Sequence, residues 1–223
     1  MLTEEMIQEN RNRFIELVSS IQREDADIDR LLKKLDSSDF FYAPASSIYD
    51  GSYVGGLCEH CLRVYDYLES LVVKVEASVD ESGGVEYKRV SKFDEDSLII
   101  VALFHDFRKM NYYEKTVKNK KVYSENGLKQ DEVGLFDWVS EVGYKIRDEK
   151  FVYGTDGQTS EFMIRQFIPL TLDESVAIVN CKGDKDGGSA YGGALCEIYK
   201  EYPLAVALHC ADMMATYYGE EMV

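Results

Sequence analysis

The sequence predicts a mainly α fold, a helical bundle that carries a small β-hairpin insertion. Apolar residues recur at helical spacing over most of the chain, and a capping box and a proline mark two expected helix starts. Between residues 112 and 150 the pattern changes to short runs rich in aromatic and β-branched residues. A chain of 223 residues can bury one sizeable core. We therefore expect one domain over 1–223, with N-terminal helices in 1–39, a helical core from 40–111 and 151–218, and the β insertion at 112–150.

Charge and composition exclude several classes of protein. The formal charge of −16, from 25 basic and 41 acidic residues, argues against general affinity for duplex nucleic acid. No stretch approaches the roughly 18 to 20 apolar residues of a membrane span, and the acidic start Met1–Glu5 differs from a signal peptide. Five cysteines, an odd number, are typical of reduced thiols. We expect a cytoplasmic protein with neither a membrane nor a duplex partner, and the oligomeric state stays open.

The first part of the chain has helical signals. Helices are predicted at 4–23, with Thr3 as N-cap, and at about 28–35, followed by a tyrosine-rich loop at 40–54. Gly55-Gly56 then begins a helix whose apolar residues recur at i, i+4, i+7, i+11 and i+14, which places them on one face. These residues are Leu57, Cys61, Val64, Leu68 and Leu71.

The middle of the chain combines one apolar helix with expected strands. The run at 98–104 is predicted to be a helix, because the acidic residues at 94–96 suit a helix N-terminus. Residues 74–92, which contain Gly83-Gly84 flanked by alternating residues, are expected to form a small hairpin or a mobile loop before it. Short strands are expected further on, the first two joined by a Lys/Asn turn. They are 113–117, 121–123, 136–139 and 144–146.

Helices are expected again towards the C-terminus. One is predicted near 160–167, and the Thr-Leu-Asp-Glu sequence at 171–174 is a capping box that begins another, ending at about Cys181. A loop rich in glycine and aspartate follows at 183–193. Pro203 suits the first turn of a terminal helix.

Two nearly all-apolar runs contain groups that are costly to bury unpaired. The first run, 98–104, leads directly into His105-Asp106, and the second, 204–215, is interrupted by His209 and Asp212. A carboxylate among aliphatic side chains costs several kcal/mol unless a positive group meets it. A bound metal ion is the usual remedy, so these positions are candidate ligands.

A third ligand candidate completes a mixed imidazole and carboxylate set. His60 lies about one residue's rotation from the apolar face of its helix, so we expect its side chain to point inward or to a cleft edge. Together with His105, Asp106 and Asp212 it predicts a divalent metal site in a helical core. The ion would be Mn, Mg, Ni, Co, Fe or Zn, and the sequence does not choose among them.

Three segments resemble a known family in their residues and their order. GGLCEHCLRV at 55–64, ALFHDFRK at 102–109 and ADMMA at 211–215 are similar to the GGLxxHxLxV, ALLHDIGK and closing AD segments of the HD-domain metal-dependent phosphohydrolase superfamily. The residues at 43–47 are also similar to a subgroup common in phage and prophage genomes. The resemblance covers about residues 40–218 and implies an HD-domain helical bundle.

The resemblance also raises the question of a second ion. Family members with two metals add histidines from middle helices, whereas this chain has Asp156 and Cys181 at the matching places. Both residue types can ligate metals, so a second ion stays open, although one ion is the expected outcome. The glycine of the HDIGK segment is Arg108 here.

The family resemblance implies catalysis by Asp106 and Lys109. Asp106 would orient or deprotonate a water molecule, and Lys109, three residues after Asp106 and facing the metal side, would bind phosphate. Arg108 is equally a phosphate ligand or a surface cation, and His209 is a candidate substrate contact that more often packs. For Lys109 the alternative is a solvated lysine at a helix end.

The expected activity is hydrolysis of a phosphate ester. The substrate would be a small nucleotide-type ligand: a nucleotide, a cyclic nucleotide or a short oligonucleotide. A non-catalytic protein that sequesters nucleotides on a degenerate HD scaffold is the main alternative. A structural protein with a vestigial site is a third possibility. Consumption of ligand separates the first two, and the third predicts no ligand.

Overall fold

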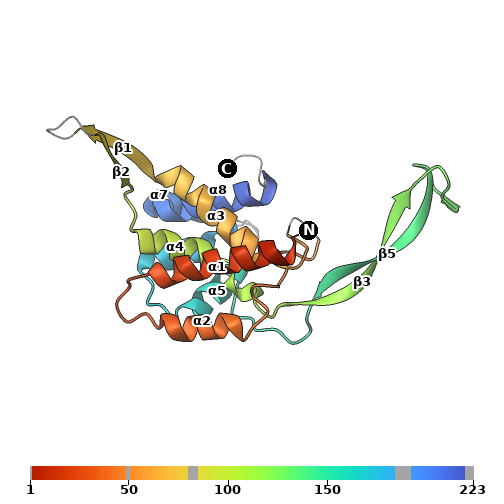
Figure 1. Ribbon diagram of the computed structural model, residues 1–223, viewed down its shortest axis with the longest axis horizontal. Helices are drawn as coiled ribbons and strands as arrows, with labels where there is room; N and C mark the ends of the chain where they lie inside the picture. The colour runs from red at the N-terminus through yellow and green to blue at the C-terminus, as the bar shows by residue number, and fades with distance from the viewer. Residues whose placement is uncertain (1, 49–50, 80–84, 184–191, 219–223) are drawn as a thin grey trace.

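The structure is a computed structural model that describes residues 2–48, 51–79, 85–183 and 192–218. Helices form its body, and two antiparallel sheets project from that body in different directions (Figure 1). The fold is therefore mixed α/β, and the predicted mainly α bundle with a single small hairpin is wrong. More than half of the strand side chains are exposed, and few are buried, so neither sheet has one fully buried face.

The two predicted N-terminal helices are confirmed as α1 (Glu4–Ser20) and α2 (Ile28–Asp36). The Thr3 hydroxyl accepts a hydrogen bond from the Met6 amide at 3.2 Å, which confirms Thr3 as the N-cap. Phe14 of α1 is fully buried in the core. Its ring packs edge to face against the Phe104 ring, with the two ring centroids 5.8 Å apart.

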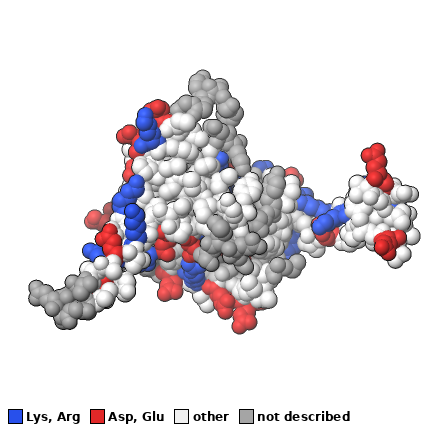
Figure 2. All heavy atoms as spheres, turned by 90° about the horizontal axis from the view of Figure 1, so that it is seen from above, with Lys and Arg blue, Asp and Glu red and all other residues white. Residues whose placement is uncertain are grey.

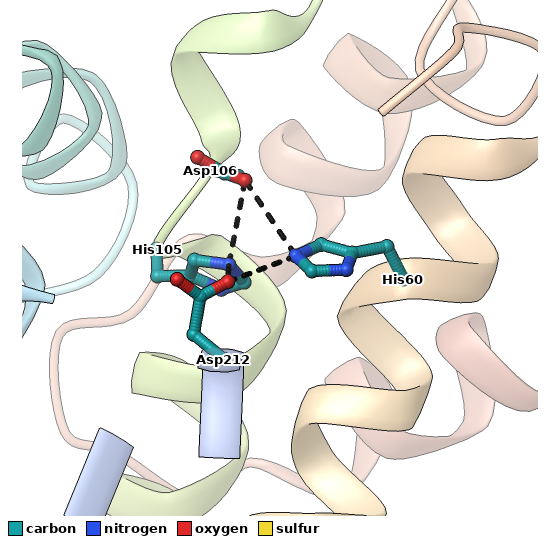
Figure 3. A group of neighbouring side chains, drawn as sticks. All are labelled: His60, His105, Asp106 and Asp212. Atoms are coloured by element: carbon teal, nitrogen blue, oxygen red, sulfur yellow. Dashed lines mark hydrogen bonds and ion pairs between the residues drawn. The ribbon is translucent and has the colours of Figure 1, made fainter. Parts of the chain in front are cut away.

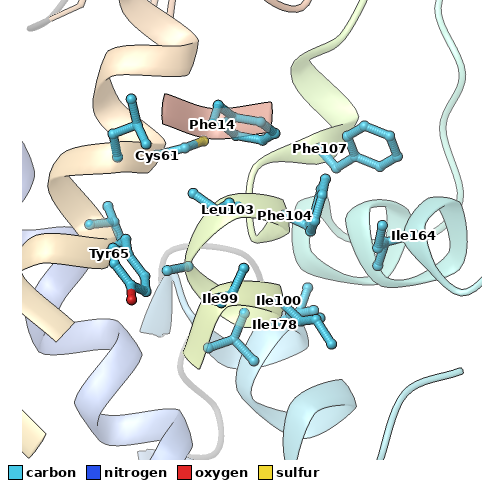
Figure 4. Packing of buried hydrophobic residues seen from close by; sticks show 14 of the residues in the cluster. Phe14, Cys61, Tyr65, Ile99, Ile100, Leu103, Phe104, Phe107, Ile164 and Ile178 are labelled. Carbon is cyan, nitrogen blue, oxygen red and sulfur yellow. The ribbon is translucent and has the colours of Figure 1, made fainter. Parts of the chain in front are cut away.

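The helix α4 (Glu95–Phe104) runs through the middle of the body. It packs against α1, α3 (Gly56–Val72) and α6 (Leu172–Asn180), and every side chain from Ser97 to Phe104 is buried. Burial on all sides explains why this helix has no polar face. Figure 4 shows α4 side chains among those of neighbouring helices in the apolar core. Because α4 is fixed on every side, the residues that follow it are held firmly in place.

The remaining helices complete the body. The predicted capping box of α6 is confirmed, with mutual hydrogen bonds between Thr171 and Glu174, and Pro203 stands in the first turn of the terminal helix as predicted. The residues around Gly83-Gly84 and most of the predicted 183–193 loop lie outside the described residues. The other elements are the 3₁₀ helix η1 (Phe107–Lys109), α5 (Asp156–Ile164), α7 (Gly192–Glu201) and α8 (Pro203–Tyr217).

One sheet is a two-stranded hairpin and the other is a long arm. β1 (Lys74–Val79) pairs with β2 (Val85–Val90), which confirms the hairpin predicted within 74–92. In the arm, β5 (Leu135–Ile146) lies between β3 (Tyr113–Tyr123) and the short β4 (Lys129–Gln130). Figure 2 shows lysine and arginine side chains along the stem of this arm.

The predicted strand boundaries in the arm are wrong. The Lys/Asn segment expected to turn continues β3 instead, so that β3 pairs with β5 without a break from Tyr113 opposite Ile146 to Tyr123 opposite Phe136. Lysines are tolerated in mid-strand here because both faces of the arm reach solvent over most of its length. None of the helices that the structure describes has the length and apolar content needed to cross a membrane.

Candidate metal centre

Four buried side chains from three helical elements converge at one point. His60 comes from α3, His105 and Asp106 from the end of α4, and Asp212 from α8 (Figure 3). One potential ligand atom from each lies within 4.8 Å of those of the other three. The structure therefore brings together the four residues that the sequence indicated, and the group could hold a metal ion.

The start of α3 sets the position of His60. Gly55 precedes the helix with a φ of 84°, in the left-handed region that favours glycine. A Cβ on Gly56 would lie 2.2 Å from the carbonyl oxygen of Gly51, so only glycine permits this close approach. The paired glycines thus let α3 begin against the preceding turn, one turn before His60.

The spacing of the four ligand atoms suits a single ion. His60 Nε2 lies 3.1 Å from Asp212 Oδ1 and 3.7 Å from Asp106 Oδ2, and His105 Nε2 lies 3.5 Å from each of these oxygens. Ligands at bond lengths of about 2.1 Å are separated by about 3.0 to 3.4 Å in octahedral and tetrahedral shells. Small side-chain adjustments would convert the observed spacing into a coordination shell.

The imidazole of His105 is fixed by a backbone hydrogen bond. Its Nδ1 donates a hydrogen bond to the carbonyl oxygen of Ala102 at 2.8 Å, since a carbonyl only accepts. The other ring nitrogen, Nε2, faces the cluster and carries the lone pair when the ring is neutral, and it has no hydrogen-bond partner among the described residues. A buried nitrogen without a partner calls for an explanation, and a metal ion held by this group would supply one.

Burial and charge set the protonation states in the cluster. Burial lowers the pKa of His60 to about 4, which keeps this imidazole neutral at pH 7 and available as a ligand. Burial also lowers the pKa of His105, but the carboxylates of Asp106 and Asp212 raise it above its ordinary value overall. A bound cation would oppose that protonation by repelling the imidazolium charge.

Two lysines reach the carboxylates. Lys109 Nζ lies 2.6 Å from Asp106 Oδ2, and Lys182 Nζ lies 3.1 Å from the same oxygen and 3.1 Å from Asp212 Oδ2. Burial alone would raise the pKa of both carboxyl groups, but these ammonium groups hold the pKa of Asp106 well below its ordinary value, and Lys182 does the same for Asp212.

Sequence reasoning missed Lys182. The lysine follows the buried Cys181 at the end of α6 and precedes a glycine, a context without a recognisable motif. Its partners lie 76 and 30 residues away along the chain, at Asp106 and Asp212. Two buried carboxylates need positive partners, and this need was a signal that a lysine such as Lys182 could supply one.

A cavity of about 730 Å³ opens beside the cluster. Its wall combines two cluster residues, three cations and hydroxyl groups, which is suited to an anionic and polar ligand. The residues that bear on its chemistry are Ser46, Ser47, His60, Arg108, Lys109, Tyr113, Asp156, Lys182, Asp212 and Thr216.

Asp156 is the ion-pair partner of Arg108 in the cavity wall. Arg108 also lies over the Tyr112 ring at 4.6 Å, and its amide donates to the Ser160 hydroxyl at 3.2 Å. The side chain of Asp156 is 42% exposed, and it does not join the four-residue cluster. Arg108 therefore lies at the cavity, held by its neighbours.

Cys181 and His209 lie apart from the cluster. Cys181 is fully buried in the apolar core, and its thiol is not among the grouped ligand atoms. His209 Nδ1 donates to the Cys181 carbonyl oxygen at 2.6 Å, and its ring stacks on Tyr199. His209 therefore contacts the backbone of the turn that carries Lys182, and it is not among the residues that line the cavity.

Comparisons of this chain with known protein families, with curated proteins and with solved structures found no match.

Proposed function

We propose that this protein is a metal-dependent phosphohydrolase that acts on a nucleotide, a cyclic nucleotide or a short oligonucleotide. The observation that carries the proposal is the convergence of two imidazoles and two carboxylates beside a cation-lined cavity. A mixed shell of this kind leaves coordination positions for water and substrate. The three segments similar to the HD-domain phosphohydrolases contribute all four residues of the cluster, which supports the same activity.

His60, His105, Asp106 and Asp212 would hold the ion. When bound, a divalent ion would lower the pKa of a water molecule and polarise a phosphoryl oxygen. Borderline metals such as Mn²⁺, Co²⁺, Ni²⁺, Fe²⁺ or Zn²⁺ suit two imidazoles better than Mg²⁺, which prefers oxygen ligands.

Asp106 would orient the attacking water. Because two ammonium groups hold its pKa well below the ordinary value, its carboxylate is a weak base. We therefore assign Asp106 to accepting a hydrogen bond from the water, with proton removal left to the ion's effect on that water. Holding the water in a fixed orientation lowers the entropic part of the activation free energy.

Lys109 and Arg108 would bind the phosphate. Both line the cavity, and Lys109 Nζ already lies 2.6 Å from Asp106 Oδ2, so a phosphate next to the cluster would be within its reach. The Arg108 guanidinium offers paired donors to phosphate oxygens, with Asp156 and Tyr112 fixing its direction. Their charges would stabilise the negative charge that develops on the transferring group.

A nucleotide-binding protein without turnover is the second candidate. The specific observation in its favour is that Lys109 and Lys182 already neutralise the two carboxylates. A site balanced in this way would bind an anionic ligand in the cavity without requiring an ion. The two candidates differ in whether the ligand is consumed.

A substrate screen tests the proposal. The protein is incubated with Mn²⁺, Mg²⁺, Ni²⁺ or Co²⁺ and with nucleoside phosphates, cyclic nucleotides or short oligonucleotides, and released phosphate or product is measured. We expect turnover that Asp106→Asn abolishes. The matched control is Asp36→Asn, which removes the same charge from a largely exposed ion pair with Arg11 and should leave turnover unchanged. Equal turnover by Asp106→Asn would place the chemistry elsewhere, and binding without consumption would favour the second candidate.

A further inference from the structure

Lys182 bridges the two carboxylates of the metal centre. Its ammonium lies 3.1 Å from Asp106 Oδ2 and 3.2 and 3.1 Å from the two oxygens of Asp212. Lys109 contacts Asp106, whereas Lys182 contacts both acids. The ammonium of Lys182 thus lies between the two carboxylates, which is where a cation bound by both would also lie.

The turn that presents Lys182 is fixed on both sides. Cys181 before it is buried in the core, and Gly183 after it has a φ of 61°, in the left-handed region. His209 Nδ1 donates to the Cys181 carbonyl at 2.6 Å, which ties this turn to α8, the helix that also carries Asp212. The lysine is therefore placed by the fold at the carboxylates.

The carboxylates of the cluster are already paired with positive charges, so binding of a divalent ion requires a rearrangement. Asp106 and Asp212 contribute two negative charges, and Lys109 and Lys182 contribute two positive charges, so these four side chains together carry no net charge. A divalent ion would bring two further positive charges into a largely buried group. The carboxylate oxygens in the cluster that would bind an ion, Asp106 Oδ2 and Asp212 Oδ1, also accept from Lys182, so an ion there would meet the ammonium at close range.

We propose that Lys182 competes with the divalent ion for Asp106 and Asp212, and that the displaced ammonium moves to a phosphate oxygen in the cavity. This inference rests on the proposed phosphohydrolase function. The side chain of Lys182 lines that cavity and is 20% exposed, and its flexible stem permits the movement. Ion and phosphate would consequently bind with positive cooperativity. The ion would pair with the carboxylates, and the phosphate would pair with the ammonium that the ion displaces.

A Mn²⁺ titration of the chelator-treated 223-residue chain tests the competition. Calorimetry compares the wild type with Lys182→Met, which keeps the apolar stem and removes the ammonium. The matched control Lys200→Met removes the same charge from an exposed position on α7. We expect Lys182→Met to bind Mn²⁺ about tenfold more tightly or better, because displacing charge-assisted hydrogen bonds weakens the wild type by at least that factor. The Lys200→Met variant should match the wild type.

Equal or weaker Mn²⁺ binding by Lys182→Met would overturn the proposal. Should this variant not fold, Lys182→Gln, which keeps a hydrogen-bond donor without the charge, takes its place with the same expectation. A Mn²⁺-loaded wild type that hydrolyses nothing would reject only the proposed function. Equal affinity in all variants would reject only the role of Lys182, and the failure of every variant to bind Mn²⁺ would reject both.

Inorganic phosphate provides the second readout. In the wild type, phosphate should raise the affinity for Mn²⁺, and the increase should be several-fold smaller in Lys182→Met, which has no ammonium to transfer. Low Mn²⁺ concentrations prevent precipitation of manganese phosphate. Sulfate at equal ionic strength controls for general screening of electrostatic interactions. A phosphate effect of the same size in both proteins would show that the ammonium of Lys182 does not move to the anion.

Discussion

Arg23 binds Glu174 through both of its terminal nitrogens, with Nη1 3.0 Å from Oε2 and Nη2 2.6 Å from Oε1. The carboxylate also accepts from the Ser97 hydroxyl at 2.6 Å and from the Thr171 amide at 2.7 Å. The Glu174 side chain is completely buried and that of Arg23 is 16% exposed. This group joins the segment after α1 to α4 and α6, so it supports the scaffold that holds the candidate metal centre.

Glu174→Gln should destabilise the protein at neutral pH by about 3 kcal/mol or more, because it leaves a largely buried guanidinium without its partner. Burial raises the pKa of Glu174, but Arg23, Ser97 and Thr171 lower it overall below its ordinary value of 4.5. A lowered pKa means that the stabilisation is fully present above pH 4.5 and is lost as the pH falls through the lower pKa of the folded state. The free energy of unfolding in denaturant, measured at pH 7 and below pH 4, checks both points.

Asp36→Asn is the control for this prediction. It removes a carboxylate from the more exposed Arg11–Asp36 pair, and it should cost less than about 1 kcal/mol. A Glu174→Gln effect of that small size, or one that grows as the pH falls, would show that the buried pair does not stabilise the fold in the expected way.

Gly56→Ala should destabilise the protein by about 1–3 kcal/mol and weaken metal binding, because the new Cβ meets backbone atoms and shifts the start of α3. The nearest of those atoms, the Gly51 carbonyl oxygen, would lie at 2.2 Å. In the matched control Gly143→Ala, the Cβ meets the flexible side chain of Lys118 on the arm. Thermal unfolding and Mn²⁺ titration of both variants measure the two effects. A Gly56→Ala variant as stable as Gly143→Ala would contradict the close approach.

The centre should hold one ion per chain, without a contribution from Asp156 or Cys181. Asp156 forms an ion pair with Arg108, and Cys181 is fully buried in the apolar core. Burial also works against a thiolate in the absence of a metal. Metal analysis of protein purified without chelator should therefore give the same content for wild type, Asp156→Asn and Cys181→Ser. Two tightly held ions, with one lost in either variant, would contradict this prediction.

The sequence was most informative where burial conflicts with residue type. His105 and Asp106 follow a helix that is buried on all sides, and Asp212 interrupts a second apolar run, so the cost of burying them indicated a shared cation. Helices that begin with local capping signals, such as Thr3 or the 171–174 capping box, were also predictable, because the signal and the structure lie within a few residues.

Long-range and solvent-exposed features were not predictable in the same way. Lys182 acts on residues 76 and 30 positions away, so no local pattern relates it to the carboxylates. The arm was misjudged because most of its strand residues are exposed on both faces, and without a buried face alternation carries no signal. The lysines in β3 then resembled a turn, although the strand continues through them.

The most direct test of the four-residue metal centre compares the chain's three histidines. His60→Gln and His105→Gln each remove one imidazole ligand, whereas His209→Gln changes a histidine whose ring contacts the Cys181 carbonyl instead. The measurement is calorimetric titration of each chelator-treated protein with Mn²⁺. We predict one ion per chain for the wild type and for His209→Gln, and binding at least about a hundredfold weaker for His60→Gln and His105→Gln, since each lost ligand removes several kcal/mol of binding free energy. Equal affinity in all three variants, or a loss confined to His209→Gln, would contradict the account.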